Sequence, residues 1–489
     1  MRPHFAKATF IMKLIPIYTW NKGVVNFNRK SDRLSKQPWF QGVLLLCCVI
    51  VAMLLANLPF TKHFYHDFLQ TSLQLHMFNS DGSVDLLFPR DMTVEKFIND
   101  ILMVVFFFTV GLEIKREIAY GELSTPKKAL MPVIAAFGGV IAPAVIFTII
   151  NHGTAAAGGW GIPTATDIAF AVCILSVLGE KVPTSLKVFL TALAIADDLI
   201  AILVVAIFYG GSINLPLLGI SLVVIALTLL LRRIGEKRMF PYIFMALIVW
   251  ILFYYSGIHA TMSGVVMAFL IPSQARYNKA QYYHKRDHYI KLLDSLNELN
   301  DGEAFPNGPQ KHCLRQLHGI AQGSMDMSYR VEHALSPWVN FLIMPIFALA
   351  NAGVTITSLS YFNIFTSTIV DHPEFGFVGL GIFLGLLLGK PIGITLFSWT
   401  AIKLKVGEMP AKATWPMFFA VACLGGIGFT MSIFVDTLSF GGAADEATIS
   451  AMRDAGKIAV LMGSIAAGIL GSVLVNVVYK LQGGKKVAE

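Results

Sequence analysis

Long apolar stretches separated by short polar segments run along almost the whole chain. A helix of about 20 apolar residues crosses a bilayer, and twelve stretches approach or exceed this length. The pattern therefore predicts an all-α polytopic membrane protein with about 12 transmembrane helices. The predicted spans are residues 40–58, 97–114, 129–150, 163–178, 184–209, 214–231, 239–255, 258–271, 337–352, 376–402, 416–440 and 457–479.

Two polar segments between the predicted spans have features of their own. Residues 66–92 contain the turn sequence NSDG (79–82) between short mixed segments, which predicts a small external β-hairpin. Residues 273–336 form a long polar segment, and the spacing of its residues His284, His288, His312 and His318 matches no zinc-binding pattern. We therefore expect a solvated cytoplasmic loop there rather than a metal site.

Basic residues are distributed unevenly between the predicted loops. With a cytoplasmic N-terminus, 32 of the 38 Lys and Arg residues fall in cytoplasmic segments and five lie in or beside outer loops. Because cytoplasmic loops carry an excess of Lys and Arg, both termini are expected inside. The predicted division of the chain is a cytoplasmic segment 1–39, spans 1–8 over 40–272, the polar loop 273–336, spans 9–12 over 337–480, and a cytoplasmic tail 481–489.

Composition agrees with a membrane protein and excludes several other classes. The chain is 55% hydrophobic and 14% charged, which is untypical of a large soluble enzyme. The net charge of +8 is explained by loop topology, so no nucleic-acid partner is expected. Five cysteines form no CxxC pair, and we expect inert thiols and no cofactor.

A few charged residues lie deep inside the predicted spans. Asp197 and Asp198 are adjacent in one span, and Asp167 and Lys390 lie in two others. One carboxylate at mid-membrane costs about 2.5–3.5 kcal/mol on the insertion scale, so several together suggest a site that handles a cation or protons. Neighbouring helical residues point about 100° apart. We therefore expect one aspartate of the pair to face the ion pathway and the other to reach Lys390.

Two of the predicted spans contain residues that disfavour a continuous helix. Pro163 and two threonines precede Asp167, and the sequence GGIG (425–428) interrupts the eleventh span. Irregular backbone at membrane depth is tolerated only where it is buried in protein or lines a cavity. Paired interruptions in the two halves of a chain indicate a transporter site.

The tenth predicted span carries glycines at intervals of four residues before and after Lys390. Gly381, Gly385, Gly389 and Gly393 line one helix face, which allows a neighbouring backbone to approach closely. The resemblance of this segment to a phosphate-binding loop fails because Pro391 replaces the required Ser or Thr. Lys390 is therefore interpreted as a countercharge for the acids.

A site of three acids and one base suits an exchanger. Like charges close together in poorly solvated surroundings favour binding of a proton by at least one carboxylate. A carboxylate that titrates near the working pH holds either a proton or a small cation. Exchange then requires only that the site faces one side of the membrane at a time and moves when it is loaded.

Seven stretches, spread over nearly the whole chain, resemble the NhaA family of bacterial sodium/proton antiporters in the family's order. They are FFFTVGLEIKREIAYGEL (106–123), PTATDIAFAV (163–172), TALAIADDL (191–199), SGIHATMSGVV (256–266), IFALANAGV (346–354), GKPIGI (389–394) and GGIGFTMSIF (425–434). The rule about paired broken helices was drawn partly from this family, so it gives no independent support.

The resemblance implies inverted repeats with two crossed broken helices, in an inner-membrane homodimer that uses the external hairpin. It implies electrogenic export of Na+ or Li+ in exchange for protons, with activation at alkaline pH. By position, Asp198 would bind Na+ together with Asp167 and the Thr166 region. Asp197 would exchange the proton and pair with Lys390.

Further positions match family residues that are linked to pH control or to the ion path. The resemblance implies that Asp100 is an acid of the periplasmic side. The pH-sensing candidates are Glu113, Glu117, His259, Glu332 and His333. Three features depart from the family: the length of the polar loop, Ser336 in place of an expected histidine, and the additional Asp436. We interpret Asp436 as a water-exposed residue at the mouth of the path.

Other functions fit the sequence less well. An intramembrane aspartyl protease would need two acids from different helices, but its usual GxGD context is missing and Lys390 would interfere with a shared proton. A passive channel agrees with broken helices, although buried acids paired with a lysine would trap ions. A bile-acid-type sodium symporter matches the motifs poorly. We therefore expect a transporter and not an enzyme.

Overall fold

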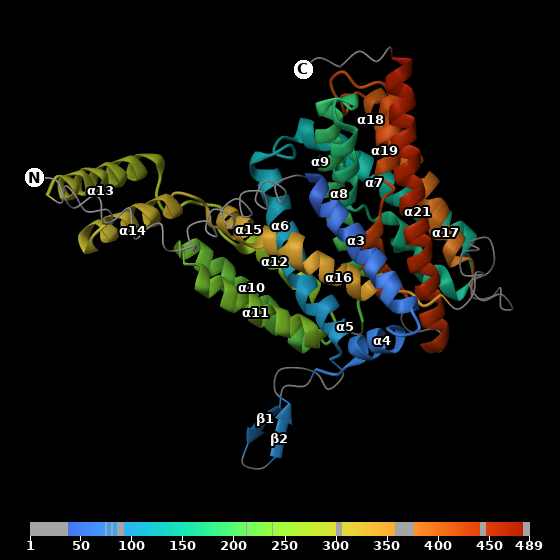
Figure 1. Cartoon of the computed structure of the whole chain (residues 1–489), viewed down its shortest axis with the longest axis horizontal. Helices are drawn as coiled ribbons and strands as arrows, with labels where there is room; N and C mark the ends of the chain where they lie inside the picture. Colours follow the sequence, from blue (N-terminus) through green and yellow to red (C-terminus); the bar gives the residue numbers. More distant parts are fainter. Residues whose placement is uncertain are drawn as a thin grey trace, which may run out of the picture.

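Helices that coincide with the predicted apolar stretches form almost all of the described structure. The computed structural model describes residues 38–73, 76–79, 82–85, 92–211, 213–236, 238–299, 306–356, 376–440 and 446–482. Nearly all of the predicted N-terminal segment and most of the predicted tail lie outside these residues. Figure 1 shows a bundle of long helices, with a small sheet at one end and a helical pair extending sideways.

Nine helical stretches among the described residues are long and apolar enough to cross a membrane. They comprise α3 (Pro38–Asn57), α5–η1–α6 (Val94–Phe97, Ile98–Leu102, Met103–Tyr120), α7 (Pro126–Ile150), α9 (Thr184–Phe208), α10 (Leu215–Ile234), α11 (Met239–Ser256), α15–η4–α16 (Met327–Trp338, Val339–Ile343, Met344–Asn351), α17–η7–α18 (Val378–Leu384, Gly385–Gly389, Lys390–Lys403) and α21 (Glu446–Leu481).

Two further stretches are interrupted where the sequence predicts broken helices. The 3-10 helix η2 (Ala155–Thr164) is followed after a short gap by α8 (Ile168–Leu178) and η3 (Gly179–Lys181), with a bend of 41°. Helix α19 (Trp415–Leu424) is followed by α20 (Phe429–Ser439) with a bend of 53°. If each bent pair is counted as one span, the described residues contain up to eleven candidate spans.

The predicted count of about twelve spans is not confirmed, because residues 258–271 contain no helix long enough to be counted. They contain α12 (Thr261–Leu270), a helix of only ten residues, which at 1.5 Å per residue covers about half of a 30 Å hydrocarbon core. The carbonyl groups at the end of α12 are bonded by a cation from α6, since Lys115 donates to Ala268 O at 3.3 Å and Phe269 O at 3.1 Å. A positive charge at a helix C-terminus is stabilising, so this short helix ends inside the protein without unpaired carbonyls there.

The predicted hairpin segment contains a two-stranded antiparallel sheet. Strand β1 (His76–Asn79) pairs with β2 (Gly82–Asp85), and Asn79 lies opposite Gly82 across the turn. Helix α4 (Lys62–Gln70) precedes this sheet in the chain. Figure 1 shows the sheet projecting from the helical body, at the end away from the C-terminus. Its position outside the cell stays a prediction.

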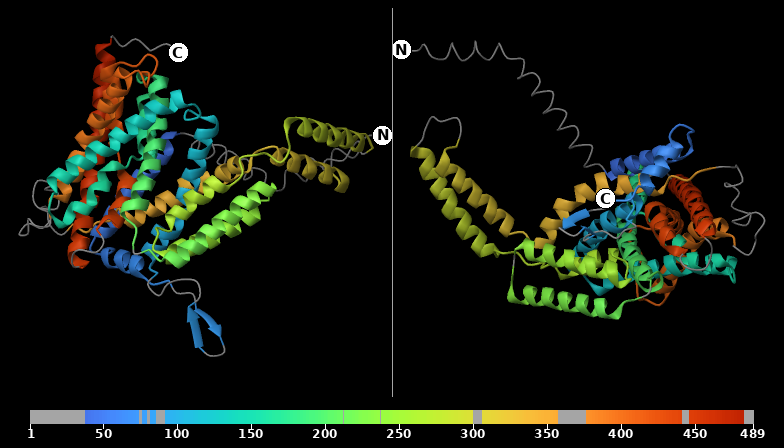
Figure 2. Two further views of the ribbon diagram at one scale, coloured as in Figure 1. Left: turned by 180° about the vertical axis from the view of Figure 1, so that it is seen from behind. Right: turned by 90° about the horizontal axis from the view of Figure 1, so that it is seen from below.

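The polar segment 273–336 contains two helices, α13 (Lys279–Leu299) and α14 (Gly308–Gly323). Both extend sideways from the bundle in all three views (Figures 1 and 2). At their base, the backbone N–H groups of Arg276 and Tyr277 donate to Gly323 O at 2.7 and 3.0 Å. Because α15 begins at Met327, the predicted boundary at 336 falls inside a helical stretch.

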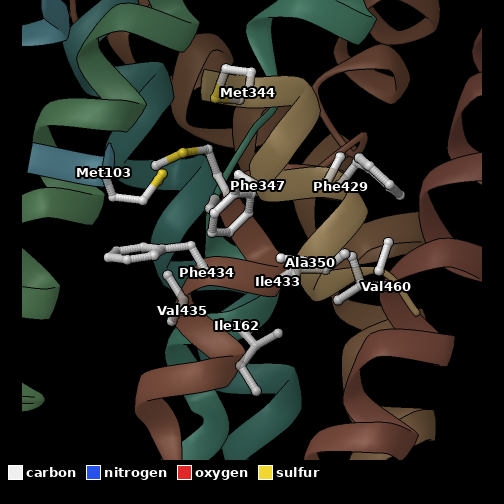
Figure 3. Packing of buried hydrophobic residues seen from close by; sticks show 14 of the residues in the cluster. Met103, Ile162, Met344, Phe347, Ala350, Phe429, Ile433, Phe434, Val435 and Val460 are labelled. Carbon is white, nitrogen blue, oxygen red and sulfur yellow. The ribbon is translucent and has the colours of Figure 1, made fainter. Parts of the chain in front are cut away.

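The broken helix α20 lies in the centre of a large hydrophobic cluster. The ring of Phe434 lies 5.2 Å from that of Phe107 on α6 and 6.3 Å from that of Phe347 on α16. Figure 3 shows Val435 and Phe434 of α20 close to Ile162 of η2 and Met103 of α6. One half of each broken pair, η2 in the first and α20 in the second, is therefore embedded in side chains from several helices.

The predicted glycine face of the tenth span is confirmed. Gly381, Gly385, Gly389 and Gly393 each face α7 or the broken segment, at distances that leave no room for a Cβ. A Cβ on Gly393 would lie 2.1 Å from the carbonyl oxygen of Gly138 on α7. The backbones of α18 and α7 touch at this point, as the repeat of small residues predicts.

We expect Gly393→Ala to lower the thermal stability of the protein strongly, because the added Cβ would clash with the carbonyl group of Gly138, which cannot move without shifting the backbone of α7. The matched control is Gly219→Ala on α10, where an added Cβ meets no atom within 4 Å and the change should be neutral or stabilising by up to about 1 kcal/mol. The measurement is the melting temperature of the detergent-solubilised variants. Equal melting temperatures for the two variants would contradict the predicted close contact.

Candidate functional site

The two broken segments meet at their breaks. The backbone N–H of Asp167 donates to Ile427 O at 2.7 Å, and Thr166 Oγ1 donates to Gly425 O at 2.9 Å. Residues between η2 and α8 thus pair with residues between α19 and α20. The glycines and Pro163 leave these stretches non-helical, and their freed backbone groups bond across the two breaks instead of within a helix.

Asp167 accepts hydrogen bonds from the first turns of two helices. Its Oδ1 accepts from Ala169 N at 3.1 Å and Phe170 N at 3.4 Å, which makes it the N-cap of α8. Its Oδ2 accepts from the backbone N–H of Thr430 at 3.0 Å and from the Thr430 hydroxyl. Helix N-termini carry partial positive charge, so this buried carboxylate lies where negative charge is stabilised.

Thr430 is a site residue that sequence reasoning did not name. The available signal was its position just after the interruption at residues 425–428, where the backbone N–H groups of a new helix are unpaired. What the sequence does not show is that this helix start faces Asp167, about 260 residues earlier. Thr430 also lines the cavity described below.

Lys390 is paired with Asp197 and with the broken segment. It is 1% exposed, and its Nζ lies 2.5 Å from Asp197 Oδ2 and 2.9 Å from Thr166 Oγ1. Thr166 in turn donates to Gly425 O at the end of α19. The ammonium group therefore balances both a carboxylate and the negative C-terminal end of a helix. A buried lysine in this arrangement is a countercharge.

Asp198 faces a different direction from its neighbour. It is 3% exposed, and its Oδ1 has no hydrogen-bond partner among the described residues. It lines a cavity of about 520 Å³ that also reaches Asp167 and Thr430. The two adjacent aspartates of α9 are thus divided between two tasks, since Asp197 pairs with Lys390 and Asp198 borders the cavity.

Charged residues of α6 and α15 line another part of the same cavity. Arg116 forms an ion pair with Glu332, and its Nη2 lies 3.3 Å from Glu117 Oε1 and 3.7 Å from Glu113 Oε1. Three of the five predicted pH-sensing residues line the cavity, namely Glu113, Glu332 and His333, and a fourth, Glu117, contacts Arg116. Arg116 was present in the motif of residues 106–123 but was not named as a site residue. It is the cation that holds the three glutamates together.

His259 and Asp100 lie apart both from the cavity and from the contacts of Lys390 and Arg116 described above. The Nε2 of His259, near the start of α12, contacts the carbonyl oxygen of Tyr209 at the end of α9. Asp100 lies in the π-helical turn η1. Neither residue belongs to the cavity lining. Ser336 does line it, and its hydroxyl donates to Glu332 O at 2.7 Å.

The interpretation of Asp436 as a water-exposed residue is wrong. Its side chain is 0% exposed, and neither carboxylate oxygen has a hydrogen-bond partner among the described residues. It lies on α20, outside the lining of the cavity. The sequence could not show this, because a charged residue near the end of a span can be either exposed to water or buried in the protein.

The chemistry available to the cavity is binding of a small cation or of protons. Within the described residues, no three His, Cys, Asp or Glu side chains are grouped so that they could hold a metal ion. A cation at Asp198 and Asp167 would take its remaining oxygen ligands from hydroxyl groups, carbonyl groups or water, as hard alkali cations do.

We expect Thr430→Val to raise the apparent KM for the transported cation about ten- to a hundredfold, the loss that corresponds to one charge-assisted hydrogen bond. Valine keeps the shape of threonine but removes the hydroxyl that donates to Asp167. Thr437→Val is the matched control on the same helix, since that hydroxyl donates only to Phe434 O within its own turn. An unchanged KM in Thr430→Val, measured by ion-dependent transport in vesicles, would exclude this role.

The fold defines a multi-pass helical membrane protein with a cavity that reaches the meeting point of two broken helices. The family model described as Na+/H+ antiporter 1 matches residues 32–475. The Na(+)/H(+) antiporter NhaA of Oleidesulfovibrio alaskensis is 39% identical over 439 residues, which cover 90% of this chain and 92% of that protein. The NhaA proteins of Acidithiobacillus ferrooxidans and Escherichia coli O157:H7 are each 38% identical over 431 residues, covering 88% of this chain and 93% of theirs. The chain belongs to the Na+/H+ antiporter 1 family.

Proposed function

We propose that this protein exchanges Na+ or Li+ for protons across the bacterial inner membrane. The observation that carries the proposal is the position of Asp198, a nearly fully buried carboxylate with a free oxygen at the cavity shared with Asp167. A proton and a small cation compete for such a group. No second function is favoured by any contact at this site.

In the proposed mechanism, the cation binds at Asp198 and Asp167 while protons leave, and the reverse occurs on the other side. Asp197 exchanges its proton in step with its pairing to Lys390. Carriage of more than one proton per cation makes the exchange electrogenic, so an inside-negative potential supports sodium export. The two broken segments, as crossed counterparts in inverted repeats, move relative to the rest of the bundle.

The cluster of Arg116 and its three glutamates supports a proposal for pH control. Arg116 contacts Glu113, Glu117 and Glu332, so protonation of any one carboxylate changes the ion pairs of the others. When all three carboxylates are ionised, one guanidinium group faces three negative charges. We infer that this state activates transport. The external hairpin is the proposed contact between the subunits of a homodimer, whose helical bundles lie in membrane lipid.

The competing functions are less well supported by the geometry. In a protease, two carboxylates would share a proton and activate water, but both oxygens of Asp167 accept hydrogen bonds and Asp197 is paired with Lys390. In a channel, a water-filled path would continue through the protein. The packing of α20 around Phe434 and Val435 fills the region beyond the breaks with apolar side chains instead (Figure 3).

The test uses everted vesicles from a host that lacks its own sodium/proton exchangers. Respiration acidifies the lumen, NaCl or LiCl is added over a series of pH values, and ΔpH is followed by dye fluorescence. We expect dequenching with both salts, rising with pH, and none with choline chloride. Correctly inserted protein without sodium-dependent dequenching would contradict the proposal and direct attention to K+, Ca2+ or organic anions.

A further inference from the structure

Asp436 is a buried charged residue that the proposed exchange does not use. It lies on α20, and both of its oxygens lack partners among the described residues. It follows the break at residues 425–428 by about two helical turns, so it lies on the side of the breaks that α20 occupies and not on the side of the cavity. A solitary ionised carboxylate in such surroundings is strongly destabilising.

Helix α21 brings cations to this carboxylate. A Cβ on Gly456 would lie 2.0 Å from Asp436 Oδ1, so the carboxylate lies directly against the backbone of α21. Lys457 and Arg453 are the positive groups that act on Asp436 electrostatically, and Asp454 is the negative one. Arg453 and Gly456 are three residues apart and therefore lie on the same face of α21. The Nε of Arg453 is also buried without a partner in the described part of the chain.

The third element near Asp436 is η2, which is bonded to Tyr209 at the end of α9. The Tyr209 hydroxyl donates to Gly158 O at 2.8 Å and accepts from Gly161 N at 2.9 Å. A Cβ on Gly158 would lie 3.0 Å from Ser439 O, so η2 and the end of α20 are in contact. Asp436 acts electrostatically on Tyr209 as well. The charged and titratable groups around Asp436 are therefore Lys457, Arg453, Asp454 and Tyr209.

These contacts fill the region on the opposite side of the breaks from the cavity with packed side chains. Phe434 and Val435, the two residues before Asp436, are buried among Ile162 of η2 and residues of α6 and α16 (Figure 3). Alternating access requires this packing to separate when the transport site opens to that side. Lys457 and Arg453 are only partly buried, so water that enters here would meet them and the carboxylate together.

We propose that Asp436 is a second proton-binding group, which holds a proton while α20 and η2 are packed together and releases it when they separate. On release, the carboxylic O–H bond breaks, the proton passes to an incoming water molecule, and the carboxylate pairs with Lys457 and Arg453. Closure reverses each step. The inference rests on the proposed alternating access, and it makes opening on this side dependent on the pH of that side.

The test compares sodium uptake by everted vesicles, whose lumen corresponds to the outer side, as the lumenal pH is varied at fixed external pH. In wild type, we expect the rate to fall at acidic lumenal pH, because protonated Asp436 keeps the outer half closed. The asparagine of Asp436→Asn cannot ionise, so the acid-side transition should be absent from this variant. Its transport rate should be about tenfold lower than that of wild type, since one pH unit changes the degree of protonation about tenfold. The apparent KM for Na+ on the external face should stay unchanged.

A second variant keeps the proposal testable if Asp436→Asn fails to insert. Lys457→Gln removes a positive charge that stabilises the carboxylate, so the acid-side transition should move to higher lumenal pH by on the order of one unit. Lys480→Gln, at the other end of α21, is the matched control and should leave the transition in place. A purely structural role would lower the rate equally at all lumenal pH values.

The outcomes separate the two proposals. A wild-type protein without sodium-dependent uptake would remove the proposed function itself. A second outcome is that the wild-type protein exchanges sodium but the acid-side transition is unchanged in Lys457→Gln and in any Asp436→Asn protein that inserts. This outcome would overturn the role of Asp436 alone. Loss of the transition in Asp436→Asn or its alkaline shift in Lys457→Gln would support the proton-binding group.

Discussion

Asp198→Asn is expected to abolish sodium-dependent exchange while the protein is still inserted in the membrane. Asparagine has the shape of aspartate but cannot ionise, so the site loses the charge that binds both the cation and the proton. Asp198 pairs with no lysine, and its Oδ1 has no partner among the described residues. The substitution therefore removes no ion pair, and the effect should fall on transport rather than on folding. We expect the rate to fall at least about a hundredfold, the equivalent of losing close to 3 kcal/mol of binding.

The measurement is dequenching in everted vesicles after NaCl addition, with the amount of inserted protein determined in parallel. Asp67→Asn on the exposed face of α4 is a matched control that should behave as wild type. Direct binding of Na+ to the purified protein gives a second readout. Substantial exchange by Asp198→Asn at normal protein levels would remove this residue from the transport site.

Lys390→Ala is expected mainly to lower stability and to shift the pH profile of transport. Lys390 and Asp197 are both almost fully buried and lie 2.5 Å apart. Removing one partner leaves an uncompensated charge in the protein interior, which costs about 3–5 kcal/mol in buried pairs. The substitution also removes the positive charge that stabilises ionised carboxylates in the site. The activity profile should therefore move towards alkaline pH.

The matched control is Lys403→Ala, an exposed lysine at the end of the same helix, α18. Melting temperatures of the solubilised variants test the first effect, and dequenching over a pH series tests the second. Adding Asp197→Asn to Lys390→Ala should restore part of the lost stability, since the double variant leaves no buried charge at this pair. Wild-type stability with an unchanged pH profile in Lys390→Ala would contradict the countercharge interpretation.

The positions of the broken segments could be predicted because the cause lies within a few residues. Pro163 and the run of glycines at 425–428 disfavour helical backbone wherever they occur, and both interruptions lie where these residues predict. The close contact along Gly381–Gly393 is similarly local, because only a face without side chains permits it. Helix α12 ends at Leu270, one residue before the Ile271–Pro272 pair, and hydropathy alone does not show that Lys115 bonds the carbonyl groups at its end.

The division of roles among the charged residues depended on contacts across the chain. The angle between adjacent residues of a helix indicated that Asp197 and Asp198 point apart, but not which one meets Lys390. The partners of Asp167 on α20 and the link from Arg116 to Glu332 join residues more than 200 positions apart. His259 lies away from the cavity that the other pH-sensing candidates approach.

By itself, the sequence determined the membrane class, most of the spans, the two breaks and the set of charged residues that the interior must accommodate. These follow from the cost of placing polar groups in hydrocarbon, which acts on each segment separately. Only the tertiary structure decided which charges are paired, which one borders the cavity, and that Asp436 is buried against Gly456. Pairing depends on distances between segments that are remote in sequence, and the packing of the helices alone sets those distances.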